Sequence, residues 1–92
     1  MSIERRRLFY EGRVQGVGFR MTAARLARAH PVAGHVRNLD DGRVELLVEG
    51  DRPAVLAFLE AIRRELGEGI RDVVAVPEPT DPVPLAGFSI RH

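Results

Sequence analysis

The chain has 92 residues, of which 45% are hydrophobic and 29% are charged, a balance that excludes an intrinsically disordered chain. This length suits one domain with a thin core, so we expect a single domain over residues 1–92. A formal charge of +1, from 14 arginines against 13 acidic residues, is too small to indicate nucleic acid, and the absence of cysteine excludes disulfides, thiolate catalysis and cysteine-bound zinc.

The first predicted element is a strand from Leu8 to Val14, where apolar or small residues recur at every second position. Gly16 and Gly18 interrupt this alternation, and from Phe19 the apolar residues follow a helical spacing. Pro31 is expected to end the helix, because proline lacks the amide hydrogen that a helix interior needs.

A hairpin and a second helix are predicted next. The runs His35–Asn38 and Val44–Val48 are expected to be strands, and Asp41-Gly42 between them is typical of a hairpin turn. Asp51 is a suitable helix N-cap, and the apolar spacing after it predicts a helix that ends near Gly67.

Two strands are expected to close the chain. The β-branched run Ile70–Val76 predicts a strand, Pro77–Pro84 must be a loop or an edge segment, and Phe88 and Ile90 mark a short terminal strand. The order β-α-β-β-α-β, with the terminal strand added, predicts an α+β fold, the ferredoxin-like split βαβ sandwich. In this fold two helices cover one face of a mostly antiparallel sheet.

The topology predicts a site at one edge of this sheet. Because strand–helix–strand crossovers are right-handed, the first two strands should run parallel, with the third strand between them. The loop after the first strand, the start of the first helix and the end of the second strand then share one edge. Groups that point inward from both sides could hold one small ligand there.

The glycine-containing loop at this edge is a candidate cradle for phosphate. Glycines let backbone N–H groups turn inward, and the helix N-terminus adds a partial positive charge. Arg20, in the first helical turn, would close over the anion. The alternative is that Gly16 and Gly18 only form a tight turn and that Arg20 is a solvated helix residue.

Asn38 has two interpretations as well. An asparagine before Leu-Asp-Asp-Gly is most often a turn residue whose side chain bonds its own backbone. Against this, the predicted topology brings Asn38 to the edge that Arg20 occupies.

Two segments resemble the signature segments of the acylphosphatase family. They are Gly12–Arg20, which reads Gly-Arg-Val-Gln-Gly-Val-Gly-Phe-Arg, and Gly34–Glu45, which reads Gly-His-Val-Arg-Asn-Leu-Asp-Asp-Gly-Arg-Val-Glu. The likeness extends to the closing Gly87–Ile90. It implies an enzyme without metal or cofactor that hydrolyses the carboxyl-phosphate anhydride bond of small acyl phosphates to a carboxylate and inorganic phosphate.

The same resemblance implies roles for single residues. Five loop residues would bind the phosphoryl group, or a phosphate or sulfate ion, through their amides: Gln15, Gly16, Val17, Gly18 and Phe19. Arg20 would be the phosphate-binding arginine, and Asn38 would orient the attacking water. A carboxylate is a weak base and a good leaving group, so positioning and charge stabilisation can suffice for this phosphoryl transfer.

Two positions depart from the family pattern. His35 stands where the family usually has an aromatic residue, and Tyr10 where it usually has an aliphatic one. Both are interpreted as packing changes, and the expected role of His35 is structural. The arginines at residues 5–7 are expected to be a solvated approach to the first strand, with some capacity to attract anionic substrates.

Two alternatives of other classes share parts of this pattern. RNA-recognition motifs have the same element order, but they stack bases on aromatics of the central strands, and here only Phe9 could serve. A carbamoyl-phosphate-binding accessory domain is the second alternative. Because no further domain follows His92, we expect a free-standing hydrolase.

The remaining expectations concern location and partners. No apolar run approaches the ~20 residues of a membrane span, and the first seven residues, Met-Ser-Ile-Glu-Arg-Arg-Arg, carry charges where an export signal is apolar. Three scattered histidines have no spacing typical of a metal site. We therefore expect a cytoplasmic monomer that contacts neither membrane nor nucleic acid.

Overall fold

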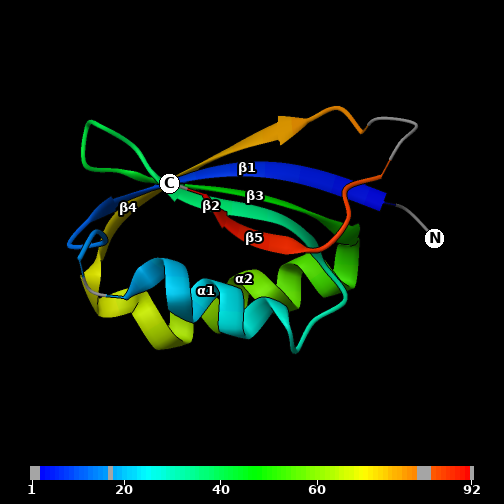
Figure 1. Cartoon of the computed structure of the whole chain (residues 1–92), viewed down its shortest axis with the longest axis horizontal. Helices are drawn as coiled ribbons and strands as arrows, with labels where there is room; N and C mark the ends of the chain where they lie inside the picture. The colour runs from blue at the N-terminus through cyan, green and yellow to red at the C-terminus, as the bar shows by residue number, and fades with distance from the viewer. Residues whose placement is uncertain (1–2, 17, 81–83, 92) are drawn as a thin grey trace.

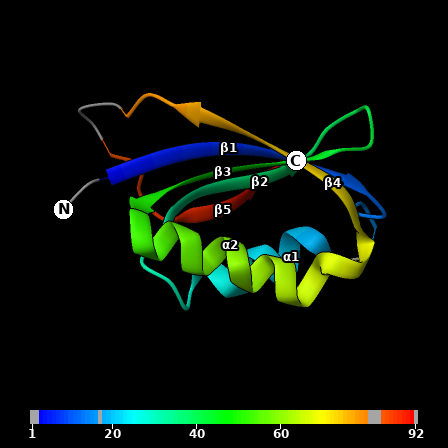
Figure 2. The ribbon, with the colours of Figure 1, turned by 180° about the vertical axis from the view of Figure 1, so that it is seen from behind.

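The computed structural model describes residues 3–16, 18–80 and 84–91 of the chain. Its elements within those ranges are, in order, β1 (Ile3–Gly12), α1 (Phe19–Ala27), β2 (Ala33–Asn38), β3 (Val44–Asp51), α2 (Arg52–Leu66), the 3-10 turn η1 (Gly67–Gly69), β4 (Ile70–Glu78) and β5 (Phe88–Arg91). Figure 1 shows both helices on one side of the sheet, and the reverse view in Figure 2 shows the same two layers. The predicted ferredoxin-like fold is confirmed.

The five strands form one mixed sheet with the order β4-β1-β3-β2-β5. Strand β1 runs antiparallel to β3 and β4, β2 runs antiparallel to β3, and β5 runs parallel to β2. Since β1 and β2 are both antiparallel to the strand between them, they are parallel to each other, as the sequence predicted. Figure 1 shows the loop after β1, the β2–β3 hairpin and the end of β5 at the same end of the sheet.

The core lies between the sheet and the two helices. It is formed by alternate side chains of the strands, one stripe of each helix and one residue of the loop after β1: Leu8, Tyr10, Val14, Phe19, Ala23, Leu26, Ala27, Val36, Val44, Leu46, Val48, Val55, Phe58, Ala61 and Ile62. Each large side chain buried here contributes about 1.5–3 kcal/mol relative to leaving it in water. In the described part of the chain, no helix combines the length and the apolar character required to cross a bilayer.

The sheet face opposite the helices, which we call the open face, carries a network of ion pairs. The carboxylate of Glu45 accepts from Nε of Arg37 at 2.7 Å and lies 3.0 Å from Nη1 of Arg7 and 3.6 Å from Nε2 of His35. Arg7 also donates from Nε to Glu78 on β4 at 2.7 Å. Arg7 therefore joins carboxylates of two different neighbouring strands.

The network sets the protonation preferences of its members. Burial pushes the pKa of Glu45 upward, but the hydrogen bonds from Arg37 and Arg7 outweigh it, so the net pKa lies below the ordinary value. Burial, with the nearby charge of Arg91, lowers the pKa of His35. The contact with Glu45 places His35 on the open face, on the side away from the helices, which is consistent with the predicted structural role.

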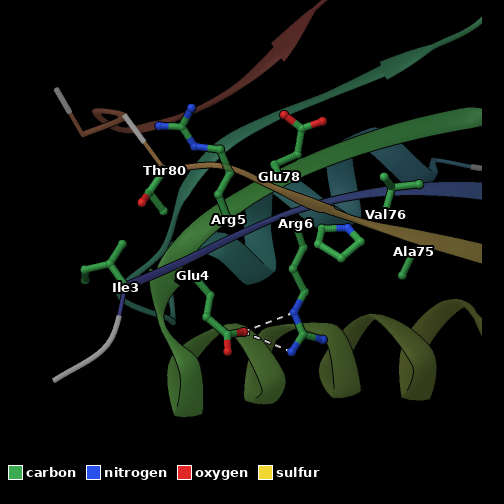
Figure 3. Close-up of a pocket in the computed structure, with 9 residues that line it drawn as sticks. Ile3, Glu4, Arg5, Arg6, Ala75, Val76, Glu78 and Thr80 are labelled. Atoms are coloured by element: carbon green, nitrogen blue, oxygen red, sulfur yellow. Dashed lines mark hydrogen bonds and ion pairs between the residues drawn. The ribbon is translucent and has the colours of Figure 1, made fainter. Parts of the chain in front are cut away.

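Strand β1 is longer at its start than the sequence indicated. It begins at Ile3 rather than Leu8, because its pairing with β3 and β4 continues along the arginine run. The expectation that these arginines are solvated is wrong for Arg5: its side chain is only 8% exposed and its Nη2 lies 2.7 Å from Glu49. In Figure 3, Arg6 and Glu4 lie together on the side of α2, whereas Arg5 points the opposite way.

Two predicted boundaries also shift. Strand β1 ends at Gly12, at a bulge in its pairing with β4, so that Val14 lies in the following loop, yet it remains buried at 1% exposure. Helix α1 ends at Ala27, ahead of Pro31, and the chain continues in tighter turns. Asp51 occupies the predicted N-cap position of α2, although its side chain makes no capping hydrogen bond to a described residue.

Strand β4 is an outer edge of the sheet and is only lightly covered. Its residues Val73, Val74 and Val76 are 41%, 49% and 41% exposed. Pro77 lies within this strand, which fits an edge position because proline cannot donate to a further strand.

Candidate active site

Two glycines of the loop between β1 and α1 have backbone conformations that an anion cradle can use. Gly16 and Gly18 have φ values of 76° and 79°, the left-handed region that glycine adopts without strain. Apart from its chain neighbours, a Cβ atom at either position would meet no described atom within 4 Å, so glycine is required for the backbone conformation and not for space. Val17, the residue between them that the sequence assigned to the cradle, lies outside the described residues.

The start of α1 adds backbone donors beside this loop. Gly18 is the N-cap, and its carbonyl accepts the amide of Thr22 at 2.9 Å. The first amides of a helix have no partner within the helix, and they carry its partial positive charge. The ring of Phe19 is buried against Tyr10, with 4.9 Å between ring centroids, so Phe19 anchors the helix start and only its amide can serve an anion.

Arg20 follows in the first turn of α1 and is half-buried. Its Nη1 donates to the carbonyl oxygen of Arg91 on β5 at 3.3 Å. In the parallel pairing of β2 with β5, Arg91 is the partner of Arg37, the residue before Asn38. The contact therefore brings Arg20 to the end of β2 at which Asn38 lies.

Asn38 is the last residue of β2 and lies opposite Val44. Since side chains alternate along a strand, Asn38 shares the helix-facing side of the sheet with Val36. Its Oδ1 atom is shielded from solvent and has no hydrogen-bond partner among the residues that the structure describes. Buried polar atoms without a partner are uncommon and costly, which makes this oxygen a candidate for a role in binding or catalysis.

The turn interpretation of Asn38 fails on this geometry. It requires the side-chain oxygen to accept from the chain's own backbone, and that bond is absent within the described residues. Asp41 is the residue that stabilises the turn in this way, because its Oδ1 accepts a hydrogen bond from the backbone amide of Arg43 at 3.1 Å. This hydrogen bond lowers the pKa of Asp41.

Gln15 makes a contact that the sequence did not indicate. Its Nε2 donates to the carbonyl oxygens of Leu39 at 2.8 Å and Arg43 at 3.0 Å. These residues are 24 and 28 positions away along the chain, so only the folded structure reveals the pair.

The described residues contain no group of three or more histidine, aspartate or glutamate side chains placed to hold a metal ion. The pocket of about 450 Å³ in Figure 3 lies between the start of β1 and the end of β4. It is therefore at the other end of β1 from the glycine loop and takes no part in the candidate site.

The parts of the candidate site share one end of the sheet. Two left-handed glycines, a helix N-terminus, a guanidinium group and an amide oxygen without a partner in the described part of the chain together suit a small tetrahedral anion with a water molecule beside it.

Comparison with known proteins identifies relatives over nearly the whole chain. The family model described as Acylphosphatase matches residues 6–90. An acylphosphatase of Yersinia pseudotuberculosis is 42% identical over 81 residues, which cover 88% of each chain. The crystal structure of the acylphosphatase from Bacillus subtilis superposes with a TM-score of 0.86 at 35% identity, over 99% of this chain and all of that one.

One similar structure is a much larger protein. HypF of T. kodakarensis matches with a TM-score of 0.83 and 27% identity. The match covers 97% of this chain but only 12% of HypF.

Proposed function

Because the chain belongs to the acylphosphatase family, and is therefore an enzyme that hydrolyses acyl phosphates, we propose an active site for this reaction. We propose that it is formed by the loop 15–19, Arg20 and Asn38. The observation that carries this proposal concerns Oδ1 of Asn38, at the end of the sheet that Arg20 reaches: it is shielded from solvent and has no partner among the described residues.

In the proposed ground state, the loop amides and Arg20 hold the phosphoryl oxygens. Backbone N–H groups of the cradle and of the first turn of α1 donate to these oxygens, and the helix N-terminus favours their negative charge. Arg20 adds charge-assisted hydrogen bonds, which contribute roughly 1.5–3 kcal/mol each. Strand β5 holds this guanidinium group in reach through the carbonyl of Arg91.

Asn38 is proposed to orient the attacking water. A water molecule that donates one hydrogen to Oδ1 of Asn38 supplies the partner that this oxygen lacks among the residues described by the structure. Its lone pair is then free to attack phosphorus. The new bond joins the water oxygen to phosphorus, the bridging phosphorus–oxygen bond breaks, and the carboxylate leaves with the electron pair. A phosphate oxygen accepts the proton of the water.

The proposed mechanism requires neither metal nor general acid, because the leaving carboxylate needs no proton. We therefore expect hydrolysis of acetyl or benzoyl phosphate to continue unchanged when a chelator is added. Dependence of the rate on added magnesium would contradict this part of the proposal.

The test compares wild type with Arg20→Ala in a steady-state assay on benzoyl phosphate. Loss of two charge-assisted hydrogen bonds of roughly 1.5–3 kcal/mol each should lower kcat/KM by at least about 10²-fold and abolish competitive inhibition by inorganic phosphate. Arg28→Ala is the matched control, because it removes the same charge from the opposite end of α1. If Arg20→Ala stays as active as the control, this site assignment is wrong.

We do not extend the proposal to RNA binding. Phe9, the candidate for base stacking, lies on the open face under the guanidinium of Arg43, 4.7 Å from its ring centroid, and opposite Glu45. Tight retention of single-stranded RNA on a filter at physiological salt would contradict this and favour RNA binding as the function.

The proposal includes a single-domain monomer that acts in the cytoplasm. The full-length match to the Bacillus subtilis enzyme supports the single domain, and Pro77 in the edge strand disfavours pairing with a second copy. Light scattering tests the monomer, and cell fractionation tests the location.

A further inference from the structure

We propose that Gln15 is a positioning residue, whose side chain clamps the β2–β3 hairpin to the phosphate loop and thereby fixes Asn38 for attack. This inference rests on the proposed water-orienting role of Asn38. It assigns the carboxamide of Gln15 a function that is separate from the phosphate-binding role of its backbone amide.

The clamp closes on the two residues that end the hairpin turn. Leu39 donates its amide to the carbonyl of Arg43 at 2.8 Å, and Gly42 donates to the carbonyl of Leu39 at 3.1 Å. Each carbonyl oxygen has a second lone pair, and Nε2 of Gln15 donates one hydrogen to each. Because both partners can only accept, the nitrogen end of the carboxamide must face them.

The backbone of Gln15 is itself held in place. Val14, immediately before it, is fully buried in the core, and Gly16, immediately after it, has the left-handed conformation of the cradle. On the other side of the clamp, Leu39 directly follows Asn38. Gln15 therefore links the start of the cradle to the residue beside the proposed water-binding oxygen.

This link matters because the attacking water must be aligned with the bound phosphoryl group. A misplacement of about 1 Å can reduce turnover by about 10²-fold. Without the carboxamide, nothing in the proposed clamp would fix the position of the hairpin, and with it Asn38, relative to the phosphate loop. The cradle amides and Arg20 do not depend on the hairpin, so binding of phosphate should survive.

The hairpin has other contacts that keep it folded without Gln15. Asp41 accepts from the amide of Arg43 and also from its Nε at 2.8 Å, and the guanidinium of Arg43 covers Phe9 on the open face. The carboxamide of Gln15 is exposed and its removal leaves no cavity in the core. A variant of Gln15 should thus fold, and Asp41 offers a control within the same turn.

The first experiment measures kcat, KM and the inhibition constant of inorganic phosphate for Gln15→Met, which keeps the chain length but has no donor. We expect kcat to fall on the order of 10-fold, with the inhibition constant of phosphate unchanged. Asp41→Ala, which loosens the turn without touching the clamp, should keep the wild-type kcat. An equal loss in Asp41→Ala, or weaker phosphate binding in Gln15→Met, would overturn the inference.

The second experiment places Gln15→Met in the Asn38→Ala background. If Gln15 acts through Asn38, the second substitution should cause no further loss of kcat. A full additional loss would show that Gln15 acts independently, and the clamp would be refuted while the role of Asn38 stands. If Asn38→Ala alone is fully active, the water-orienting role fails, and the clamp proposal falls with it.

Discussion

The side chains of Asn38 and Glu45 lie close together in the sequence and both place polar atoms where they are shielded from solvent, but they differ in their hydrogen-bond and ion-pair partners. The carboxylate of Glu45 on the open face lies near Arg7, Arg37 and His35, whereas Oδ1 of Asn38 on the helix-facing side has no partner in the described part of the chain. A buried group with all its partners serves the fold, and a buried group without one costs stability. The difference fits a structural role for Glu45 and the ligand-binding role proposed for Asn38.

The sharpest test of this comparison is Asn38→Ala. We expect kcat on benzoyl phosphate to fall by about 10²-fold, as when one transition-state hydrogen bond is removed, while phosphate still inhibits competitively. The free energy of unfolding should not fall, because Oδ1 has no hydrogen bond to lose within residues 3–16, 18–80 and 84–91. A stability loss with full activity would reverse the assignment.

Glu45→Ala should show the opposite pattern. Removal of a buried carboxylate that is 6% exposed leaves two guanidinium groups without this partner. We expect a loss of about 2 kcal/mol in a denaturant titration, below the 3–5 kcal/mol of a fully buried pair because Arg37 is partly exposed. The kcat of the folded variant should match wild type. A change in kcat at full stability would make Glu45 part of the site.

The pH dependence of stability separates His35 from both groups. Its pKa lies below 6.5 in the folded state, so the unfolded chain binds a proton more readily. Stability is therefore complete above pH 6.5 and falls as the pH decreases through that value toward the folded pKa. His35→Phe, which restores an aromatic side chain, should remove this decline when unfolding free energies are compared at pH 7.5 and 5.5. A decline of equal slope in the variant would assign it to another group.

The smallest effect is expected at the margin of the sheet. Arg71 lies 4.0 Å from Glu11, and the two side chains are 77% and 40% exposed. Exposed pairs of this kind contribute little, so Arg71→Ala should leave the free energy of unfolding unchanged within the error of a denaturant titration. A loss as large as that of Glu45→Ala would mean that exposure does not separate the two kinds of ion pair.

The element order and the candidate edge could be predicted from the sequence, because alternation, glycines and turn residues are local signals. Val14 shows the limit of such signals. The alternation predicts a strand that extends to Val14, and Val14 is buried, but the strand ends at the bulge at Gly12, which depends on the pairing with β4.

The unpredicted features all depend on register between strands or on contacts between distant loops. Arg5 could not be identified as buried, because its partner Glu49 is 44 residues away and is placed opposite it only by the β1–β3 pairing. The contacts of Gln15 with the hairpin are equally remote in sequence. Asn38 could be placed at the correct edge from topology alone, but the lack of a partner for its oxygen is a property of the folded packing.

The guanidinium group of Arg7 has a consequence for how the sheet opens. Arg7 lies on β1 and forms ion pairs with carboxylates of both β3 and β4. The planar guanidinium group of arginine, with its five N–H donors, suits such a double contact better than the single ammonium group of lysine. The outermost strand β4 is thus tied to the centre of the sheet by side chains as well as by its ladder. We therefore expect β4 to unfold cooperatively with the central strands of the sheet and not by local opening at the sheet edge.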